Sequence, residues 1–453
     1  MKYLPYQIQQ DSDITWLQNI PNHWRVIRLK FATNLINNKV NAENSNLPYI
    51  GLEHIESWTG KKLNGEISDS EGTASMFISG DVLFGKLRPY LAKVHLAKQE
   101  GLISSEALVI RCKNSVNSDF LKYYILSRDF INIVDSSTYG SKMPRASWNF
   151  IGNLPLLLPE IKEQQSIARF LDHKTAQIDT LIAKQQALLT KLTEKRTALI
   201  SHAVTKGLDP SVKMKDSGVE WLGEIPEHWE IWKVTHGFKT IGSGTTPKSD
   251  NPSFYDGNIP WITTSELRER VIYDTTHKIT EEAVKAHSTL KLYSAGSLAI
   301  AMYGATIGRL GILGTNAAVN QACCVFSESN VFYIQFVYYW LWMHRPILIS
   351  LSNGGGQPNL NQDDLKKLSV PIPSFNEQKR IANFLNEKTV KLDDQNKKVE
   401  AIIMRLQEYR STLITKAVTG KIDVRQVVYD TENSTPLMRN NSSASTLSNP
   451  VNI

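Results

Sequence analysis

Cysteine is scarce in this chain. Its 453 residues include three cysteines, Cys112, Cys323 and Cys324, which cannot all pair within one chain, and adjacent cysteines rarely bridge each other. No CxxC spacing occurs, and the ten histidines form no ligand-spaced cluster with the cysteines. We therefore expect neither a disulfide framework nor a zinc site, but a reducing compartment in which the cysteines are small buried hydrophobes.

Long apolar runs are also missing. The first residues, MKYLPYQIQQDSDITW, contain no apolar segment of the kind that a secretory signal needs. The most apolar stretch, VFYIQFVYYWLWM at 331–343, is too short to span a bilayer and is interrupted by Gln335. We expect a buried amphipathic helix there and a cytoplasmic protein.

Motifs for catalysis are absent as well. The [ND]PP[YF] loop of adenine methyltransferases has DNPSF at 250–254 as its nearest match, and the second proline is lacking. GSGTTPKS at 242–249 fails as a phosphate loop because Pro247 stands where a glycine is needed. With no Ser/His/Asp set or metal-ligand set either, we expect a chain that is not an enzyme and holds no cofactor or metal itself.

The composition allows ordinary globular domains. Apolar residues make up 41% and aromatic residues 9%, and the length suits about two to four domains. The net charge of +7 favours a polyanionic partner such as nucleic acid, although many basic proteins bind none.

The most informative feature is an internal repeat. EQQSIARFLDHKT at 163–175 returns as EQKRIANFLNEKT at 377–389, 214 positions later (377 − 163 = 214), and about 19 of 43 positions are identical between 163–205 and 377–419. A second echo pairs ITWLQNIPNHWRVIRLK at 14–30 with VEWLGEIPEHWEIWKVT at 219–235. The whole chain is therefore two copies of one plan.

Between these echoes the two copies diverge but keep traces of a shared pattern. GDVLFGKLRPYLAKV at 80–94 sits where GSLAIAMYGATIGRL sits at 296–310, and YIGLEHI at 49–55 matches WITTSEL at 261–267. Strand-like runs mixed with helical ones predict an α/β fold for each copy. The expected domains are a globular domain at 1–158, a helical spacer at 159–210, a second globular domain at 211–372, a second spacer at 373–428 and a disordered Ser- and Asn-rich tail at 429–453.

Both spacers have the apolar spacing of a coiled coil. Alternating steps of four and three residues give mostly apolar positions, and no proline or glycine interrupts the runs, so each can form one helix of about 40 residues and about 60 Å. The predicted seam consists of Ile167, Leu171, Ile178, Leu181, Leu188, Leu192 and Leu199 in the first copy and Ile381, Leu385, Leu392, Val399, Ile402, Leu406 and Leu413 in the second.

Each helix could instead pack only on its own domain. The length of the runs, their shared register and their polar interruptions at equivalent positions, Lys174/Lys388 and Gln185/Gln395, favour helices that pair with each other. Two copies of one unit can adopt a pseudo-two-fold arrangement, which predicts an antiparallel coiled coil with the variable domains at opposite ends.

These residues resemble the specificity subunit of type I restriction–modification enzymes. The resemblance rests on the paired (W)LxxIPxHW entries at 16–24 and 221–229 and on the paired PxxxEQxxIAxFL segments at 159–171 and 373–385. GQPNLNQDDL at 356–365 looks like the family's lead-in to its helix, whereas the first copy departs there with SKMPRASWNF at 141–150. The resemblance covers essentially residues 14–425.

The resemblance implies a function. Each variable domain would be a target recognition domain that reads one half of a bipartite double-stranded DNA site, and the helices would set the gap between the halves. Two modification subunits would methylate adenine at N6 with S-adenosylmethionine, and restriction subunits would add an ATP-dependent nuclease that needs Mg²⁺. The chain itself would have no catalytic site.

Candidate DNA contacts are cationic, aromatic and amide side chains in the matched turns. Cations hold phosphates and longer polar side chains reach base edges, although each such residue could equally be a solvated charge or a turn side chain. The candidates are Lys86, Arg88, Tyr90, Lys93, Tyr139, Ser141, Lys142 and Arg145 in the first copy and Tyr303, Thr306, Arg309, Gln357, Asn359 and Asn361 in the second.

Apolar positions beside the predicted seam widen the apolar stripe. They could pack on the protein's own domains or receive the modification subunits, and we favour the second. These candidates are Ile182, Leu189, Ile200, Ile403 and Ile414.

Three other functions remain open at this point. A stand-alone sequence-specific DNA-binding regulator would need no partner, a methyltransferase would label DNA unaided, and a coiled-coil scaffold would show no salt-dependent affinity for DNA.

Overall fold

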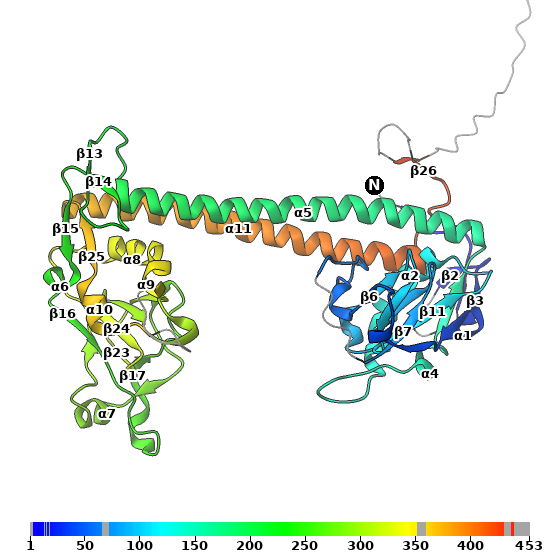
Figure 1. Cartoon of the computed structure of the whole chain (residues 1–453), viewed down its shortest axis with the longest axis horizontal. Helices are drawn as coiled ribbons and strands as arrows, with labels where there is room; N and C mark the ends of the chain where they lie inside the picture. Colours follow the sequence, from blue (N-terminus) through cyan, green and yellow to red (C-terminus); the bar gives the residue numbers. More distant parts are fainter. Residues whose placement is uncertain are drawn as a thin grey trace, which may run out of the picture. The chain divides into compact units, whose positions relative to one another are not determined.

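The structure, a computed structural model, describes residues 3–12, 14, 16–17, 19–65, 72–350, 359–429 and 436–438 (Figure 1). The chain forms two compact units: unit 1 is Met1–Gln186 with Ala401–Ile453, and unit 2 is Ala187–Glu400. Within the described residues, none of the helices combines the length and the apolar character that crossing a bilayer requires.

Unit 1 has a globular part built on two four-stranded sheets. Their strand orders are β5-β7-β10-β6 and β4-β11-β8-β9, and a separate antiparallel pair, β3 with β12, leads into α5. The strands are β1 Gln9–Asp11, β2 Asn19–Pro21, β3 Arg25–Arg28, β4 Thr33–Ile36, β5 Lys39–Asn41, β6 Tyr49–Ile50, β7 Thr73–Phe77, β8 Val82–Gly85, β9 Val94–Leu96, β10 Gly101–Ser104, β11 Ala107–Cys112, β12 Pro155–Leu158, β26 Val427–Tyr429 and β27 Pro436–Met438.

Unit 2 repeats this plan with additions. Its sheets have the orders β16-β24-β21-β22-β18 and β19-β17-β23-β20, and β15 pairs with β25 before α11 as β3 pairs with β12 before α5. The strands are β13 Met214–Asp216, β14 Glu224–Pro226, β15 Glu230–Lys233, β16 Thr240–Ser243, β17 Tyr255–Ile262, β18 Arg270–Ile272, β19 Lys278–Ile279, β20 Leu292–Tyr293, β21 Leu298–Ala301, β22 Leu310–Leu313, β23 Ala317–Val319, β24 Cys323–Ser327 and β25 Ser369–Ile372.

The globular parts contain short helices, and the repeated segments form the two long helices α5 and α11. The α-helices are α1 Leu29–Ala32, α2 Ser118–Ile125, α3 Arg128–Ser136, α4 Trp148–Ile151, α5 Ile161–Lys206, α6 Val234–Gly237, α7 Glu281–Ala286, α8 Ile334–Met343, α9 Arg345–Ser350, α10 Gln362–Lys367 and α11 Phe375–Val418. The 3₁₀ turns are η1 Ala42–Asn44, η2 Leu52–His54, η3 Pro89–Leu91, η4 Pro252–Phe254 and η5 Gly304–Thr306.

The weak sequence matches between the copies correspond to equivalent structure. Residues 80–94 form β8, η3 and β9, and residues 296–310 form β21, η5 and the start of β22. The other matched pair also agrees, since β6 runs parallel to β10 and the end of β17 runs parallel to β23. The prediction of two related α/β copies is confirmed, because the strand order β4-β11-β8-β9 of unit 1 corresponds strand for strand to the order β16-β24-β21-β22 of unit 2.

The apolar stretch and two of the three cysteines are buried as the sequence predicts, whereas Cys112 is half-buried. Residues 334–343 form α8, whose Phe336, Val337 and Trp340 are buried in the core of unit 2. Cys323 and Cys324 are buried in β24, and burial raises the pKa of the Cys324 thiol to about 12. Such thiols stay protonated at ordinary pH and act as core hydrophobes.

The two long helices are antiparallel. In unit 1 the first part of α5 packs with the last part of α11, and Asp179 pairs with Arg410. In unit 2 the last part of α5 packs with the first part of α11, and Arg196 pairs with Asp393. Both pairs connect residues related by the repeat (410 − 196 = 214 and 393 − 179 = 214), so each contact has its mate, as a pseudo-two-fold axis requires.

The seam follows a different phase from the predicted one. Ile178 is 5% exposed, whereas Leu181 is 46% exposed, and Leu188 and Ile402 are also exposed. The turned-in residues are their neighbours: Ile182 and Leu189 are half-buried, and Ile403 is buried. A fixed alternation that starts at Ile167 drifts from the true face, because a straight helix has 3.6 residues per turn rather than 3.5. Leu181, Leu188 and Ile402 are thus wrong as seam residues. The other predicted seam residues are at least partly covered: Leu192, Leu199 and Leu406 are half-buried, and the buried ones are Ile167, Leu171, Ile381, Leu385, Leu392, Val399 and Leu413.

This corrected register predicts unequal effects of two similar substitutions. Ile178→Ala should lower the free energy of unfolding by about 2–4 kcal/mol, since it leaves a cavity in a buried position. Leu181→Ala, three residues away on an exposed face, should lower it by less than about 1 kcal/mol. Urea denaturation of both variants measures the difference. Equal losses in the free energy of unfolding would instead support the predicted register, in which Leu181 lies in the seam.

Candidate nucleic-acid interface

The repeated sequence motifs fasten each long helix to its globular part. In unit 1 the Glu163 carboxylate accepts hydrogen bonds from Trp24 Nε1 at 3.1 Å and Tyr6 Oη at 2.7 Å, and it contacts His23 Nε2 at 2.9 Å. In unit 2 the Glu377 carboxylate accepts from Trp229 Nε1 at 3.2 Å and contacts His228 Nε2 at 3.0 Å. The tryptophan and histidine of the IPxHW motif are therefore partners of the glutamate in the EQ motif.

The neighbouring glutamine makes a second repeated attachment. The buried Gln164 side chain accepts from the backbone N–H of Asn117 at 2.8 Å and donates to the carbonyls of Ser115 and Pro159 at 3.0 and 2.9 Å. Gln378 does the same in unit 2 with Tyr333, Val331 and Pro373, at 2.7, 2.9 and 3.0 Å. Each glutamine thereby ties the first turn of its helix to the segment before α2 or α8.

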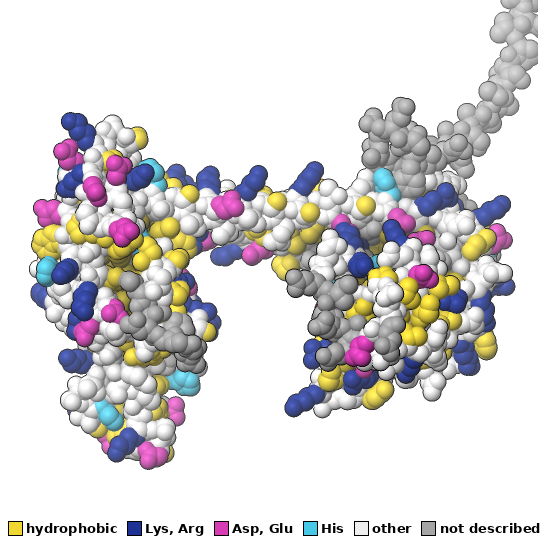
Figure 2. All heavy atoms as spheres, in the orientation of Figure 1, with side chains coloured by type: hydrophobic (Ala, Val, Ile, Leu, Met, Phe, Trp, Pro, Cys, Tyr) yellow, Lys and Arg dark blue, Asp and Glu magenta, His cyan; other side chains and the backbone are white. Residues whose placement is uncertain are grey.

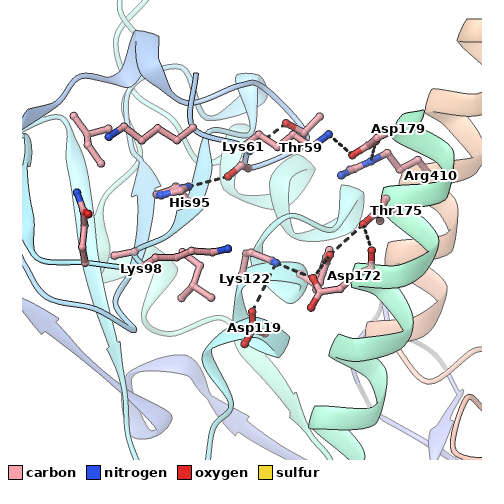
Figure 3. A pocket seen from close by; sticks show the side chains of 18 of the residues that line it. Thr59, Lys61, His95, Lys98, Asp119, Lys122, Asp172, Thr175, Asp179 and Arg410 are labelled. Atoms are coloured by element: carbon pink, nitrogen blue, oxygen red, sulfur yellow. Dashed lines mark hydrogen bonds and ion pairs between the residues drawn. The ribbon is translucent and has the colours of Figure 1, made fainter. Parts of the chain in front are cut away.

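A tyrosine from α2 or α8 makes a third repeated attachment, about two turns further along the long helix. The Tyr123 hydroxyl donates to Asp172 at 2.6 Å and lies 3.2 Å from Thr175 Oγ1 (Figure 3). The Tyr339 hydroxyl donates to Asn386 at 2.8 Å and lies 3.1 Å from Thr389 Oγ1. Sequence reasoning assigned no role to these anchors, although their recurrence in both copies was the available signal, at offsets of 214 for the threonines (389 − 175 = 214) and 216 for the tyrosines (339 − 123 = 216).

The candidate DNA-contacting segments of the first copy lie side by side. Leu87 and Arg145 form a β-bridge, and the backbone N–H of Arg88 donates to the Pro144 carbonyl at 2.8 Å. Arg88 has φ +50° at the start of η3, and its side chain is exposed. Tyr90 and Tyr139 are exposed as well, so this surface presents a cation and two aromatic rings.

The other candidates on this surface differ in what their side chains contact. Ser141 and Lys142 are exposed, and Lys86 is half-buried. The Arg145 guanidinium is held by Glu106 at 2.9 and 3.2 Å, which raises the pKa of Arg145. The Lys93 ammonium donates to the carbonyls of Leu52 and Ile55 at 2.6 and 3.0 Å, and burial lowers its pKa. Lys93 is therefore better explained as a structural lysine than as a DNA contact.

The equivalent segments of the second copy also meet. Tyr303 and Asn359 form a β-bridge, and the N–H of Leu360 donates to the Met302 carbonyl at 2.9 Å. Tyr303, Arg309 and Asn359 are exposed, and Thr306 is half-buried. Asn361 caps α10 by accepting from the Asp364 N–H at 2.7 Å, which gives its side chain a structural role. Gln357 lies outside the described residues.

The charge on these surfaces is mixed. Figure 2 shows lysine and arginine side chains spread over both globular parts, with acidic side chains among them. Among the described residues, no group of three or more His, Cys, Asp or Glu side chains is placed to hold a metal ion.

Unit 1 contains a pocket of about 940 Å³ between its globular part and the two helices (Figure 3). Lysines from three segments line it, Lys62, Lys98 and Lys122, around His95. Burial lowers the pKa of the His95 imidazole, and these three ammonium groups lower it further, whereas its hydrogen bond to the Gly60 carbonyl acts in the opposite direction. His95 is therefore neutral near pH 7.

The proposed partner-binding residues are mostly covered by the chain itself. Ile200 and Ile414 are fully buried in the cores of units 2 and 1, and Ile403 is buried. The alternative of packing on the protein's own domains therefore holds for Ile200 and Ile414, and Ile403 has little exposed surface to offer another subunit. Ile182 and Leu189 are half-buried in the seam.

Comparison with known proteins assigns the family. The type I restriction modification DNA specificity domain matches residues 26–191 and again residues 226–402. The chain belongs to this family. The two matches coincide with the two copies of the repeat.

Two curated relatives are similar along nearly their whole length, and a third along about half. The MjaVIII specificity subunit of Methanocaldococcus jannaschii is 23% identical over 428 residues, which cover 90% of this chain and 95% of that protein. The putative MjaX specificity subunit of the same organism is 23% identical over 448 residues, covering 93% and 99%. The EcoDI specificity subunit of Escherichia coli is 25% identical over 215 residues, 47% of this chain and 46% of that protein.

Solved structures share the fold of this specificity-domain protein. A chain from work on complex assembly and conformational transition of the type I R-M system aligns with a TM-score of 0.71 at 17% identity, covering 88% of this chain and 98% of that one. The HsdS subunit from Thermoanaerobacter tengcongensis aligns with a TM-score of 0.51 at 18% identity, covering 89% and 98%. Two α/β copies carried by two long helices are thus the fold of the family.

Proposed function

We propose that this chain is the DNA sequence-specificity subunit of a type I restriction–modification complex. The observation that carries the proposal is the doubled specificity domain, in which the globular part of each copy presents an equivalent pair of adjacent loops. Two readers of different sequence on one chain suit a bipartite DNA site, in which each reader recognises one half. The antiparallel coiled coil would set the length of the gap between the halves.

The chain would direct chemistry that other subunits carry out. Two modification subunits would bind S-adenosylmethionine and methylate adenine at N6, and restriction subunits would supply ATP- and Mg²⁺-dependent cleavage. The side chains described above can hold DNA, through cations on phosphates and polar or aromatic groups on bases. The role of this chain is therefore to choose the site and to present the DNA.

Methylation of DNA by the reconstituted complex tests this function. The chain is produced with its modification subunits, supplied with S-adenosylmethionine and a DNA library, and the methylated adenines are mapped. We expect two constant half-sites separated by a gap of one length, and no methylation by the chain alone. Tight specific binding without partners would indicate a stand-alone regulator, and methyl transfer by the chain alone would indicate an enzyme.

The loop pairs give a second prediction that separates the two readers. Arg88→Gln should weaken binding by about 1–3 kcal/mol at the first half-site, because an exposed cation on η3 is lost from the reading surface. Arg309→Gln should do the same for the second half-site. Lys39→Gln, which removes an exposed charge on β5, is the control with the same change in net charge. Titrations of duplexes with one scrambled half-site measure each effect. Equal losses of binding free energy for all three variants would contradict the assignment of these loops as the DNA-reading surfaces.

A further inference from the structure

A buried arginine joins three separate segments of unit 1. Arg410 of α11 is 6% exposed. Its Nε donates to Asp179 Oδ1 of α5 at 2.8 Å, and its Nη1 donates to the backbone carbonyl of Trp58 at 2.8 Å. The other Asp179 oxygen binds Lys61 Nζ at 2.7 Å. Figure 3 shows Arg410, Asp179 and Lys61 meeting where the globular part faces the helices. We call these four residues the Arg410 clamp.

The carbonyl that Arg410 holds belongs to a structured turn. The N–H of Glu56 donates to the carbonyl of Lys61 at 2.9 Å, which closes the turn. Trp58 sits within it at φ +64°, a conformation that a non-glycine residue adopts only where its surroundings impose it. The Arg410 guanidinium supplies one such constraint, because it fixes the direction of the Trp58 carbonyl.

The same residue continues the connection to the candidate reading loop. The N–H of Trp58 donates to the carbonyl of Ala92 at 3.2 Å. Ala92 directly follows η3, which contains Tyr90 and is directly preceded by Arg88. Both polar backbone groups of Trp58 are therefore used, one toward the helices and the other toward η3. A continuous series of hydrogen bonds runs from α5 and α11 to the segment that carries Arg88.

The repeat-related arginine of unit 2 is held differently. Arg196 Nε lies 3.6 Å from Asp393 Oδ1, too far for a hydrogen bond, and this nitrogen has no hydrogen-bond partner. Its guanidinium lies over the ring of Trp342 on α8 instead, at 5.1 Å. The side chains of this pair are 24% and 47% exposed, against 7% and 13% for Arg410 and Asp179. The glutamate, glutamine and tyrosine anchors recur in both units, so this contact is one place where the attachments of the two copies differ.

We propose that Arg410 is a positioning residue for DNA recognition: it fixes the first reading loop relative to the helix pair and so sharpens the selection of gap length. This inference rests on the proposed function. Arg410 touches no DNA in this scheme and acts through Trp58 and η3. Its loss should leave the identity of both half-sites unchanged and should let DNA with a wrong gap be modified. Because Arg196 makes no equivalent bond, its loss should change gap selection less.

The test uses the full chain assembled with its modification subunits and a series of duplexes. All duplexes carry both mapped half-sites, and the gap is varied in steps of one base pair. For Arg410→Gln, the ratio of methylation at the native gap to methylation at gaps one base pair shorter or longer should fall by about tenfold or more, as expected when a group loses its fixed position. Arg410→Lys keeps a charge near Asp179 but cannot hold both partners in the fork geometry of arginine. It should therefore give an intermediate ratio.

Two matched variants serve as controls. Arg405→Gln removes an exposed arginine from the same helix and should leave the ratio unchanged. Arg196→Gln removes the repeat-related residue. If Arg410→Gln does not fold, Lys61→Gln replaces it, since this side chain is 56% exposed and contributes one contact of the clamp. Its ratio should fall in the same direction by a smaller factor.

Hydrogen exchange of the turn at 56–61 separates positioning from simple stabilisation. Faster exchange in Arg410→Gln together with a lower gap ratio supports the proposal. Faster exchange with an unchanged ratio overturns it, because the clamp would then only stabilise the turn. If the unsubstituted protein itself methylates without regard to the gap, the proposed function fails, and this result is distinguishable from failure of the clamp.

Discussion

Four residues inserted in each long helix should lengthen the recognised gap by about two base pairs. Four helical residues add about 6 Å, and one base pair of B-DNA rises 3.4 Å per strand, so about two base pairs match the insertion. The insertions follow Thr193 in α5 and Asn396 in α11. These positions lie level in the antiparallel pair, because Arg196 contacts Asp393 three residues away from each. Methylation at the original gap should be lost.

The matching insertion in one helix alone is the control. With four extra residues in α5 only, the partner residues beyond the insertion no longer face each other, and methylation should fall at every gap. The half-sites of the doubly inserted protein should keep their sequences, because the insertions lie outside both globular parts. Mapping methylated adenines on a gap series measures both outcomes. A doubly inserted protein that still selects the original gap would rule out the helices as the spacer.

The fold could be predicted from the sequence because the internal repeat encodes each structural element twice, in two diverged versions. The 214-residue offset places both long helices, and the turns at 80–94 and 296–310 could be matched despite little identity. Glycine, β-formers and apolar spacing are local signals, so they identify elements before any tertiary contact is known. The antiparallel pairing followed from the symmetry that duplication permits.

The phase of the seam was less accessible because it depends on small differences that accumulate along a helix. Ile167 and Leu171 belong to a core cluster made mostly of residues of the globular part, so the alternation started from residues with a different environment. By Leu181 the predicted face had turned to solvent. Apolar residues at both Leu181 and Ile182 left the sequence ambiguous there.

The candidate interface was accessible only as a set of segments. The sequence identified the loops, and the structure shows that they are adjacent within each copy through the Leu87–Arg145 and Tyr303–Asn359 bridges. The sequence could not show that the Lys93 ammonium donates to two backbone carbonyls, because those carbonyls belong to residues 52 and 55, about 40 positions away. Nor could it connect Arg410 with Trp58, which lie 352 positions apart.

Replacing Glu163 should destabilise unit 1 more than replacing Glu377 destabilises unit 2. Glu163→Ala leaves the buried Tyr6 hydroxyl and Trp24 N–H without their acceptor. Each unsatisfied buried group costs about 1–3 kcal/mol, so a loss of about 3–5 kcal/mol is expected for unit 1. Glu377 serves one tryptophan and one histidine, and its side chain is 16% exposed against 7% for Glu163, so about 1–3 kcal/mol is expected for unit 2.

Amide hydrogen exchange reports the two losses separately, because each glutamate binds the tryptophan directly before its own strand pair, β3 with β12 or β15 with β25. The contribution of Tyr6 can be isolated by a double-mutant cycle. Burial and the Glu163 carboxylate raise the pKa of Tyr6, so its hydroxyl remains a donor at any ordinary pH. Tyr6→Phe should cost about 1 kcal/mol or more in the presence of Glu163 and almost nothing after Glu163→Ala, since the interaction is then already lost. An equal cost of Tyr6→Phe in both backgrounds would mean that Tyr6 stabilises unit 1 through packing, and the difference between the two glutamates would need another cause.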